Sequence, residues 1–174
     1  MKKIMSFSLL LCCLSIGISC EAQDDKSKRP SPPAIVTQAL KNGARVSIDY
    51  SQPSVKGRTI GKDLEPKNGE VWRTGANEAT VFETDKTVKI DGKELPAGKY
   101  GLFSIAGNDS WTIIFNKTWK QWGAYDYKEE EDAVRINVKA KKAAAFAEKM
   151  VFNIDKNGLV TLLWGDREIA FTVK

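Results

Sequence analysis

Hydrophobic and polar residues alternate one by one through much of the chain. Val46, Ile48 and Tyr50 are apolar and are separated by polar residues, and the segment 134–138 repeats the pattern. Alternation with a period of two predicts β-strands that have one buried face and one solvated face. Further segments with strand character are 79–84, 87–90, 99–105, 111–116, 149–155, 159–164 and 168–173, with 34–40 as a possible edge strand.

Turn signals separate these segments. Asp91-Gly92 and Asn157-Gly158 offer the positive φ angles that tight hairpin turns require. The segment 111–115 is apolar on both faces, which is typical of a central strand covered on both sides, and we expect Trp111 and Trp164 in the core. The sequence therefore predicts an all-β fold: a single antiparallel β-sandwich or flattened barrel of about 9–10 strands.

One segment has helical character. Residues 141–148 include four alanines, which have a high helix propensity. Because a helix this short is marginal on its own in water, the segment could equally be an extended lead into the next strand.

The first twenty residues, 1–20, have the character of a signal peptide. Two lysines precede an apolar run, 4–18, whose roughly 15 residues are fewer than the about 20 that span a bilayer. Small residues lead to Cys20, which resembles the acylated cysteine of a lipoprotein. Cleavage after Ala22 by an ordinary signal peptidase is the alternative.

These two outcomes predict different locations. A lipid on Cys20 would anchor an exported protein to a membrane of the cell envelope, and we expect the outer membrane, on its periplasmic or surface side. Cleavage after Ala22 would give a soluble periplasmic or secreted protein. The segment 21–33 is rich in charge, Ser and Pro, so we expect a disordered tether. The remaining residues, 34–174, have the size of one domain.

Composition excludes several chemistries. The chain has no histidine, and its three cysteines all lie in the leader or at its end. The domain therefore cannot carry Ser-His-Asp triads, Cys-His nucleophiles or zinc sites of the Cys/His type. No cofactor motif or calcium-loop spacing occurs, so we expect neither a cofactor nor a metal.

The charge of the chain is modest. Loss of the two leader lysines lowers the formal net charge from +5 to +3, which argues against a nucleic-acid partner. The basic run 139–142 is predicted to be a solvated face or a membrane-proximal patch.

Three polar, aromatic-rich segments are distinctive: 50–58 (YSQPSVKGR), 70–80 (EVWRTGANEAT) and 121–127 (QWGAYDY), with 95–100 (LPAGKY) between them. Together they resemble the signature of an uncharacterised bacterial envelope family, domain-of-unknown-function family 2911. The resemblance extends from Pro32 to Lys174 and implies an envelope protein, but no known activity.

Four aromatic side chains crowd into the loop 117–128. Such a loop either covers the end of a barrel as a plug or lines a binding groove. If it lines a groove where the three segments converge, the protein binds a small ligand, a glycan or a protein partner without catalysis. The candidate ligand-binding residues are then Arg58, Trp72, Arg73, Asn77, Glu78, Trp122, Tyr125 and Tyr127.

A hydrolase is the second hypothesis, although the absence of histidine disfavours an enzyme. Glu70 and Glu78 flank Trp72 and Arg73, and a retaining glycosidase needs two carboxyl groups about 5 Å apart. Its substrate would be a glycan or another envelope component. The structural alternative pairs Glu78 with Arg73 across a turn.

The long loop 52–69 also has two interpretations. Lys56 and Arg58 could bind an anion, or Arg58 could hold the loop by pairing with Glu78 or Asp126. If neither this loop nor the aromatic one binds anything, the protein is a purely structural lipoprotein, which is the third hypothesis.

Overall fold

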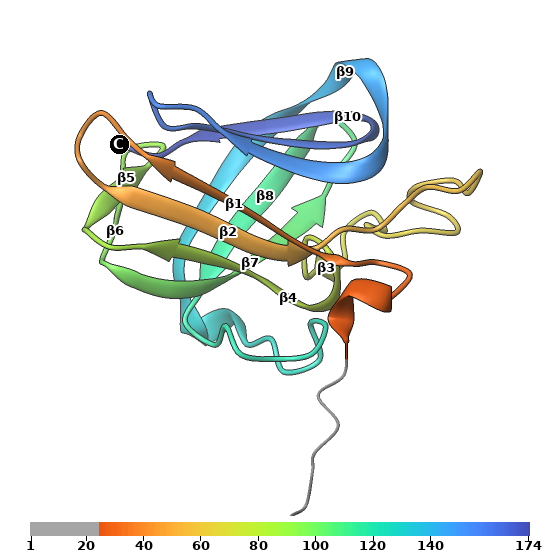
Figure 1. Ribbon diagram of the computed structural model, residues 1–174, viewed down its shortest axis with the longest axis horizontal. Helices are drawn as coiled ribbons and strands as arrows, with labels where there is room; N and C mark the ends of the chain where they lie inside the picture. The colour runs from red at the N-terminus through yellow and green to blue at the C-terminus, as the bar shows by residue number, and fades with distance from the viewer. Residues whose placement is uncertain (1–24) are drawn as a thin grey trace, which may run out of the picture.

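The computed structural model describes residues 25–174 (Figure 1). This part of the chain contains ten β-strands, two short 3-10 turns and no α-helix, which confirms the predicted all-β fold. The strands are β1 (Pro33–Ala39), β2 (Arg45–Ser51), β3 (Val71–Trp72), β4 (Ala76–Thr84), β5 (Val88–Ile90), β6 (Lys93–Leu95), β7 (Gly98–Ala106), β8 (Ser110–Asn116), β9 (Asp132–Ile154) and β10 (Leu159–Thr172), and the turns are η1 (Lys26–Lys28) and η2 (Glu129–Glu131).

The predicted signal peptide, Cys20 and the start of the tether lie outside the described residues. From Asp25 onward the predicted tether is described: Lys26 and Arg29 pair with Glu78, and β1 begins at Pro33. Within residues 25–174, no helix is long and apolar enough to span a lipid bilayer.

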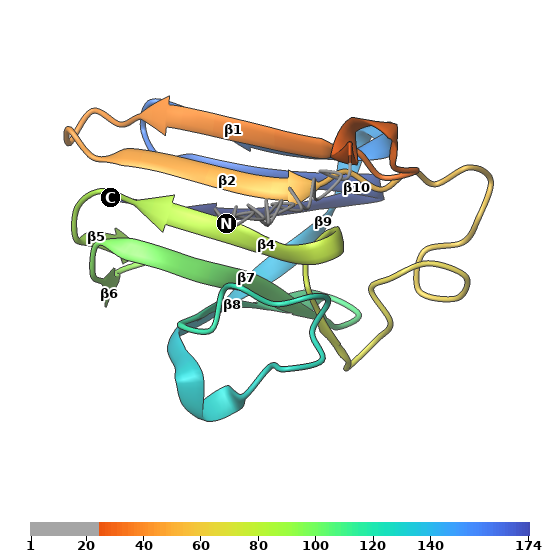
Figure 2. The same cartoon turned by 60° about the horizontal axis from the view of Figure 1, so that its bottom comes forward.

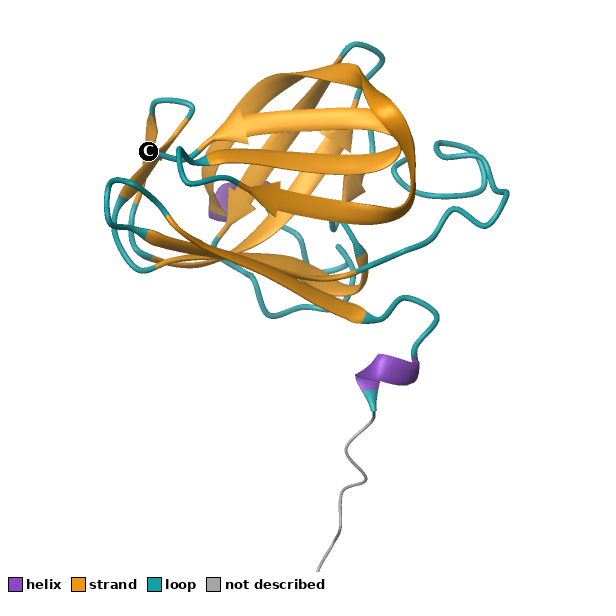
Figure 3. Ribbon diagram, turned by 45° about the horizontal axis from the view of Figure 1, so that its top comes forward, coloured by secondary structure: helices purple, strands orange, loops and turns teal. Residues whose placement is uncertain are grey.

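Eight strands form one antiparallel sheet in the order β1-β2-β4-β7-β8-β9-β10, and β3 pairs with β7 beside this path. The sheet curls into a half-barrel (Figures 1 and 3). The β5–β6 hairpin lies at one end, where Ile90 forms a bridge with Val173, and the loop 52–70 lies at the opposite end (Figure 1).

The main core fills the inside of this curl. The rings of Phe82 and Phe171 each contact Phe115 edge to face, at centroid distances of 4.9 and 5.7 Å. Trp111 and Trp164 are buried in the same core, as predicted. A second, smaller cluster on the outer face contains Ala79, Phe103 and Ile114. Strand β8 therefore contributes to both clusters, which confirms a central strand covered on both sides.

The C-terminal part differs from the prediction in how its strands are divided. Four strands were predicted here, but the structure has two, β9 and β10, which form one long hairpin. Each of them continues without a break through a segment that lacks alternation. The segments 134–138 and 149–155 both lie in β9, and 159–164 and 168–173 lie in β10 and its C-terminal extension.

The segment 141–148 belongs to β9, so its helical interpretation was wrong and the extended one is correct. Lys141 is opposite Glu168 and Ala147 is opposite Gly165 in the pairing with β10. This pairing satisfies the backbone of the alanine-rich segment, so the tertiary context overrides its helix propensity. Register shifts on both sides of Gly165 let the hairpin bend.

The far edge of β9 meets the chain that follows β2. The N–H of Val55 donates to the carbonyl of Glu148 at 2.8 Å, and the N–H of Met150 donates to the carbonyl of Pro53 at 3.0 Å. These bonds connect the two sides of the curled sheet and hold the start of the loop 52–70 close to β9.

Candidate functional site

The outer face of the sheet carries a groove of about 560 Å³. It lies between β2, the start of β4, the loop 117–128 and the segment that precedes β1. The side chains that matter for its chemistry are Lys26, Asp49, Glu78, Trp119 and Trp122.

The loop 117–128 lies along the outer side of β7 and β8 (Figure 2). The hydroxyl of Tyr127 donates to Asp132 at 2.8 Å, and its ring lies 5.2 Å from that of Phe103. Burial, together with the bond to Asp132, raises the pKa of Tyr127, so the phenol stays protonated. One side of the loop is thus packed, whereas Trp122 and Tyr125 are 53% and 83% exposed.

Backbone bonds fix the loop to the start of β4. The N–H of Ala79 donates to the carbonyl of Gln121 at 3.0 Å, and the N–H of Gly123 donates to the carbonyl of Asn77 at 3.0 Å. The side-chain amide of Asn77 donates to the carbonyl of Ser31 at 3.0 Å. Asn77 therefore joins the segment before β1 and the aromatic loop to one strand.

Glu78 is the electrostatic centre of the groove. Nη1 of Arg29 lies 3.0 Å from each oxygen of its carboxylate, and Nζ of Lys26 lies 2.9 Å from one of them. The guanidinium carbon of Arg29 is also 5.9 Å from the ring centroid of Trp122. A cation is thus held between a carboxylate and an aromatic ring, which are the two groups that best bind it.

The pKa of Glu78 reflects these contacts. Partial burial favours the neutral acid, but the hydrogen bonds from Lys26 and Arg29, with the positive charge of Lys26, outweigh burial and lower the pKa to about 2. The carboxylate therefore stays ionised at neutral pH.

Asp49 is the second carboxylate of the groove. Its side chain is exposed, and no hydrogen bond or ion pair reaches it from any described residue. Partial desolvation raises the pKa of Asp49, and the negative charge of Glu78 adds to this effect against the opposing charges of Lys26 and Lys99. The two acids thus differ in how readily they take up a proton.

Trp72 and Arg58, two of the predicted ligand-binding residues, do not line the groove and donate hydrogen bonds within the protein. Trp72 is only 3% exposed, and its indole N–H donates to the carbonyl of Gly75 at 3.0 Å. The guanidinium of Arg58 donates to the carbonyls of Ser54 and Val55, so it holds its own loop and pairs with neither of the carboxylates proposed for it.

Arg73 and Glu70 do not join Glu78 in the groove. The predicted Arg73–Glu78 pair is absent, because the ion-pair partners of Glu78 are Lys26 and Arg29. Nε of Arg73 is buried with no hydrogen-bond partner in the described part of the chain. Glu70 is exposed next to β3 and does not line the cavity.

Sequence reasoning missed Lys26, Arg29 and Asp49. The first two belong to a segment that composition marks as a tether, and Asp49 is one of several polar residues on the solvated face of its strand. Only the tertiary structure brings them close to Glu78: the register of β2 on β4 places Asp49, and the course of the chain before β1 places Lys26 and Arg29.

Among residues 25–174, no group of three or more His, Cys, Asp or Glu residues could hold a metal ion. Neither the comparison with curated proteins nor the comparison with solved structures gave a match. Residues 31–173 match the model of one family, whose description is "Protein of unknown function (DUF2911)". These residues are most of the sequence, and the chain belongs to the DUF2911 family.

Proposed function

We propose that the protein is a non-catalytic binding protein whose outer groove takes a cationic side chain of a peptide or protein partner. The observation that carries this proposal is the position of Arg29, whose guanidinium is bonded to both oxygens of Glu78 beside the ring of Trp122. This internal contact supports the proposal, because a carboxylate beside an aromatic ring is a favourable site for a guanidinium.

The rest of the groove supports a larger ligand than one side chain. Asp49 is an unpaired carboxylate within the same cavity, and Trp119 adds a second aromatic ring. An extended basic segment could place one cation at Glu78 and a second beside Asp49. A neutral glycan could stack on the same rings and donate hydroxyl hydrogen bonds to the two carboxylates, but it has no positive charge to pair with them.

If the groove binds a cationic partner, the segment before β1 competes with that partner for the carboxylate of Glu78. Lys26 and Arg29 are 55% and 19% exposed at their side chains, and both bind Glu78. A partner must displace them, so its apparent affinity is reduced by the fraction of molecules in which Arg29 occupies the site.

The experiment compares an acetylated tripeptide containing arginine with its citrulline counterpart, by calorimetry on the purified protein. Arg29→Gln should increase the affinity for the arginine peptide, because it removes the competitor and leaves the carboxylate in place. Glu78→Gln should abolish binding, and the citrulline peptide should not bind. Equal binding to Glu78→Gln, or binding of a neutral oligosaccharide alone, would overturn the proposal.

A carboxylate hydrolase is the second candidate, and a specific observation favours it. Asp49 and Glu78 line one cavity, and their pKa values are shifted in opposite directions, as in an acid and base pair. Asp49, rather than Glu70, would then be the partner of Glu78. Product release from cell-wall glycans that is lost in Asp49→Asn would support this candidate.

We propose in addition that the protein is exported and anchored by a lipid on Cys20. The features of residues 1–20 support this location, and Arg29 is only nine positions beyond Cys20. The anchor and the cation that occupies the groove would thus lie on one short segment.

A further inference from the structure

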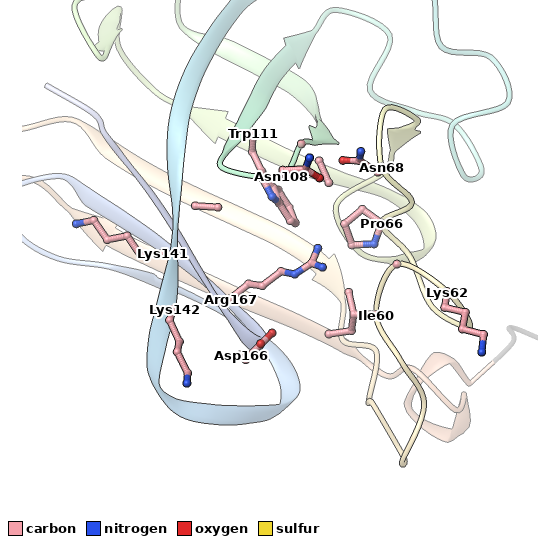
Figure 4. Close-up of a pocket in the computed structure, with 14 residues that line it drawn as sticks. Ile60, Lys62, Pro66, Asn68, Asn108, Trp111, Lys141, Lys142, Asp166 and Arg167 are labelled. Atoms are coloured by element: carbon pink, nitrogen blue, oxygen red, sulfur yellow. The ribbon is translucent and has the colours of Figure 1, made fainter.

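A second cavity, of about 630 Å³, lies at the end of the half-barrel next to the loop 52–70. Its walls come from this loop, from the turn between β7 and β8, and from the middle of the β9–β10 hairpin (Figure 4). None of the ligand-binding residues expected from the sequence lines it, and it shares no lining residue with the outer groove.

The lining of this cavity is positively charged. The residues that line it include four cations, Lys62, Lys141, Lys142 and Arg167, and one carboxylate, that of Asp166. No ion pair joins any of these five side chains to another described residue. The lining therefore carries more positive than negative charge, which attracts an anion to this end of the barrel.

Arg167 is the cation that enters the cavity. Its side chain extends from β10 toward Trp111 and Pro66, whereas the lysine side chains point away at the rim (Figure 4). A Cβ on Gly61 would lie 3.7 Å from its Nη2, so the guanidinium reaches the loop. No hydrogen bond from the guanidinium to a described residue is present. Its five N–H donors are thus available to a carboxylate or phosphate group.

Apolar side chains lie among the polar groups around the guanidinium. Trp111 is 1% exposed, and Ile60, Pro66 and Ala106 line the same cavity. The side-chain amides of Asn68 and Asn108 lie at its edge without a hydrogen bond to any residue that the structure describes. This combination suits a ligand with one acidic group, an apolar body and a polar edge.

The loop that forms one wall is firmly attached. The indole N–H of Trp164 donates to the carbonyl of Glu65 at 2.9 Å. Ile60 packs so closely on β10 that a Cβ at Gly165 would lie 2.5 Å from its Cδ1. The cavity is therefore preformed, and binding does not require the loop to be ordered first.

We propose that this cavity binds a small organic anion, a carboxylate or phosphate ester with an aromatic or branched apolar body, through the guanidinium of Arg167. The acidic group takes the N–H donors, and the apolar body lies against Trp111, Ile60 and Pro66. The proposal is independent of the outer groove.

The test titrates the purified protein with phenyl phosphate and with phenylacetate at low salt, and benzyl alcohol is the uncharged control. Amide NMR signals of Gly61 and Asn108 should shift with either anion and not with the alcohol. Arg167→Gln should weaken binding about tenfold or more, as loss of a charge-assisted hydrogen bond does. Lys142→Gln, at the rim, is the matched control and should weaken it less than about threefold.

Three results would overturn the proposal: no shift at Gly61 or Asn108 at millimolar anion, equal affinity in Arg167→Gln, or binding only to vesicles of anionic phospholipid. If Arg167→Gln does not fold, the NMR shifts of the parent protein and the affinity of Arg167→Lys for the anions test the proposal. A lysine replaces the planar fork by a point charge, so we expect weaker binding than in the parent, and unchanged binding would count against Arg167.

Discussion

The carboxylate of Glu78 holds Nη1 of Arg29 at 3.0 Å from both of its oxygens, although the two residues are 49 positions apart. This contact fastens the segment before β1 to the start of β4 and covers part of the ring of Trp122. We predict that this contact acts as a latch, which keeps the segment before β1 beside the groove and lets it leave when the contact is weakened.

Acid should release this latch. The pKa of Glu78 is lowered from 4.5 to about 2, so the contact contributes its full stability above about pH 4.5 and loses it as the pH falls toward 2. The side chain is 38% exposed, so we expect a local release worth less than about 1 kcal/mol rather than global unfolding. Hydrogen exchange of the backbone amides in 26–31, followed between pH 6 and pH 2.5, measures it.

Glu78→Gln is the control for this prediction. In this variant the amides of the segment should show low protection, relative to their intrinsic exchange rates, at every pH, because no carboxylate remains to be protonated. Protection that persists in Glu78→Gln would mean that the bond from Asn77 to Ser31 holds the segment by itself.

Two tryptophans of the signature segments should respond differently to truncation. Trp122 is 53% exposed, so Trp122→Ala should lower the free energy of unfolding by less than about 1 kcal/mol while weakening binding of the arginine peptide. Trp72 is 3% exposed and packs against Trp111, so Trp72→Ala should cost about 3–5 kcal/mol. Urea titrations measure both. A loss above about 3 kcal/mol for Trp122→Ala would make the aromatic loop a structural plug.

The strands were predictable because their signal is local. Val46, Ile48 and Tyr50 alternate with polar residues, and the structure buries all three. The continuity of β9 was not predictable, because its middle segment, 141–148, is exposed and lacks alternation. Only its pairing with β10, which is distant in sequence, makes it a strand.

The residues of the candidate sites were predictable only where they lie in a local sequence motif. Glu78 and Trp122 lie in distinctive motifs, so the sequence drew attention to them, and both line the outer groove. Arg29, Asp49 and Arg167 lie outside the distinctive sequence segments. Strand register places Asp49, the bulges beside Gly165 place Arg167, and the course of the chain before β1 places Arg29, and no local pattern encodes any of these.

The proposed anchor predicts a clear fractionation result. If Cys20 is acylated, the protein partitions with membranes, and Cys20→Ala releases it or blocks its maturation. Fractionation followed by mass spectrometry of the N-terminus tests this. An unmodified N-terminus at Gln23 would instead indicate cleavage after Ala22 and a soluble protein.

The turn between β5 and β6 should depend on one glycine. Asp91 and Gly92 have φ angles of 45° and 88°, as a tight hairpin turn with two left-handed residues requires. No atom lies within 4 Å of a Cβ added at Gly92, so Gly92→Val should destabilise the domain through backbone strain alone, by about 1–3 kcal/mol in urea titrations. Gly92→Asn is the matched control, because asparagine tolerates this conformation, and it should lose less than half as much. Since Asp91 also accepts a bond from the N–H of Thr172 at 2.8 Å, a valine variant as stable as the parent would mean that this contact holds the hairpin whatever the turn type.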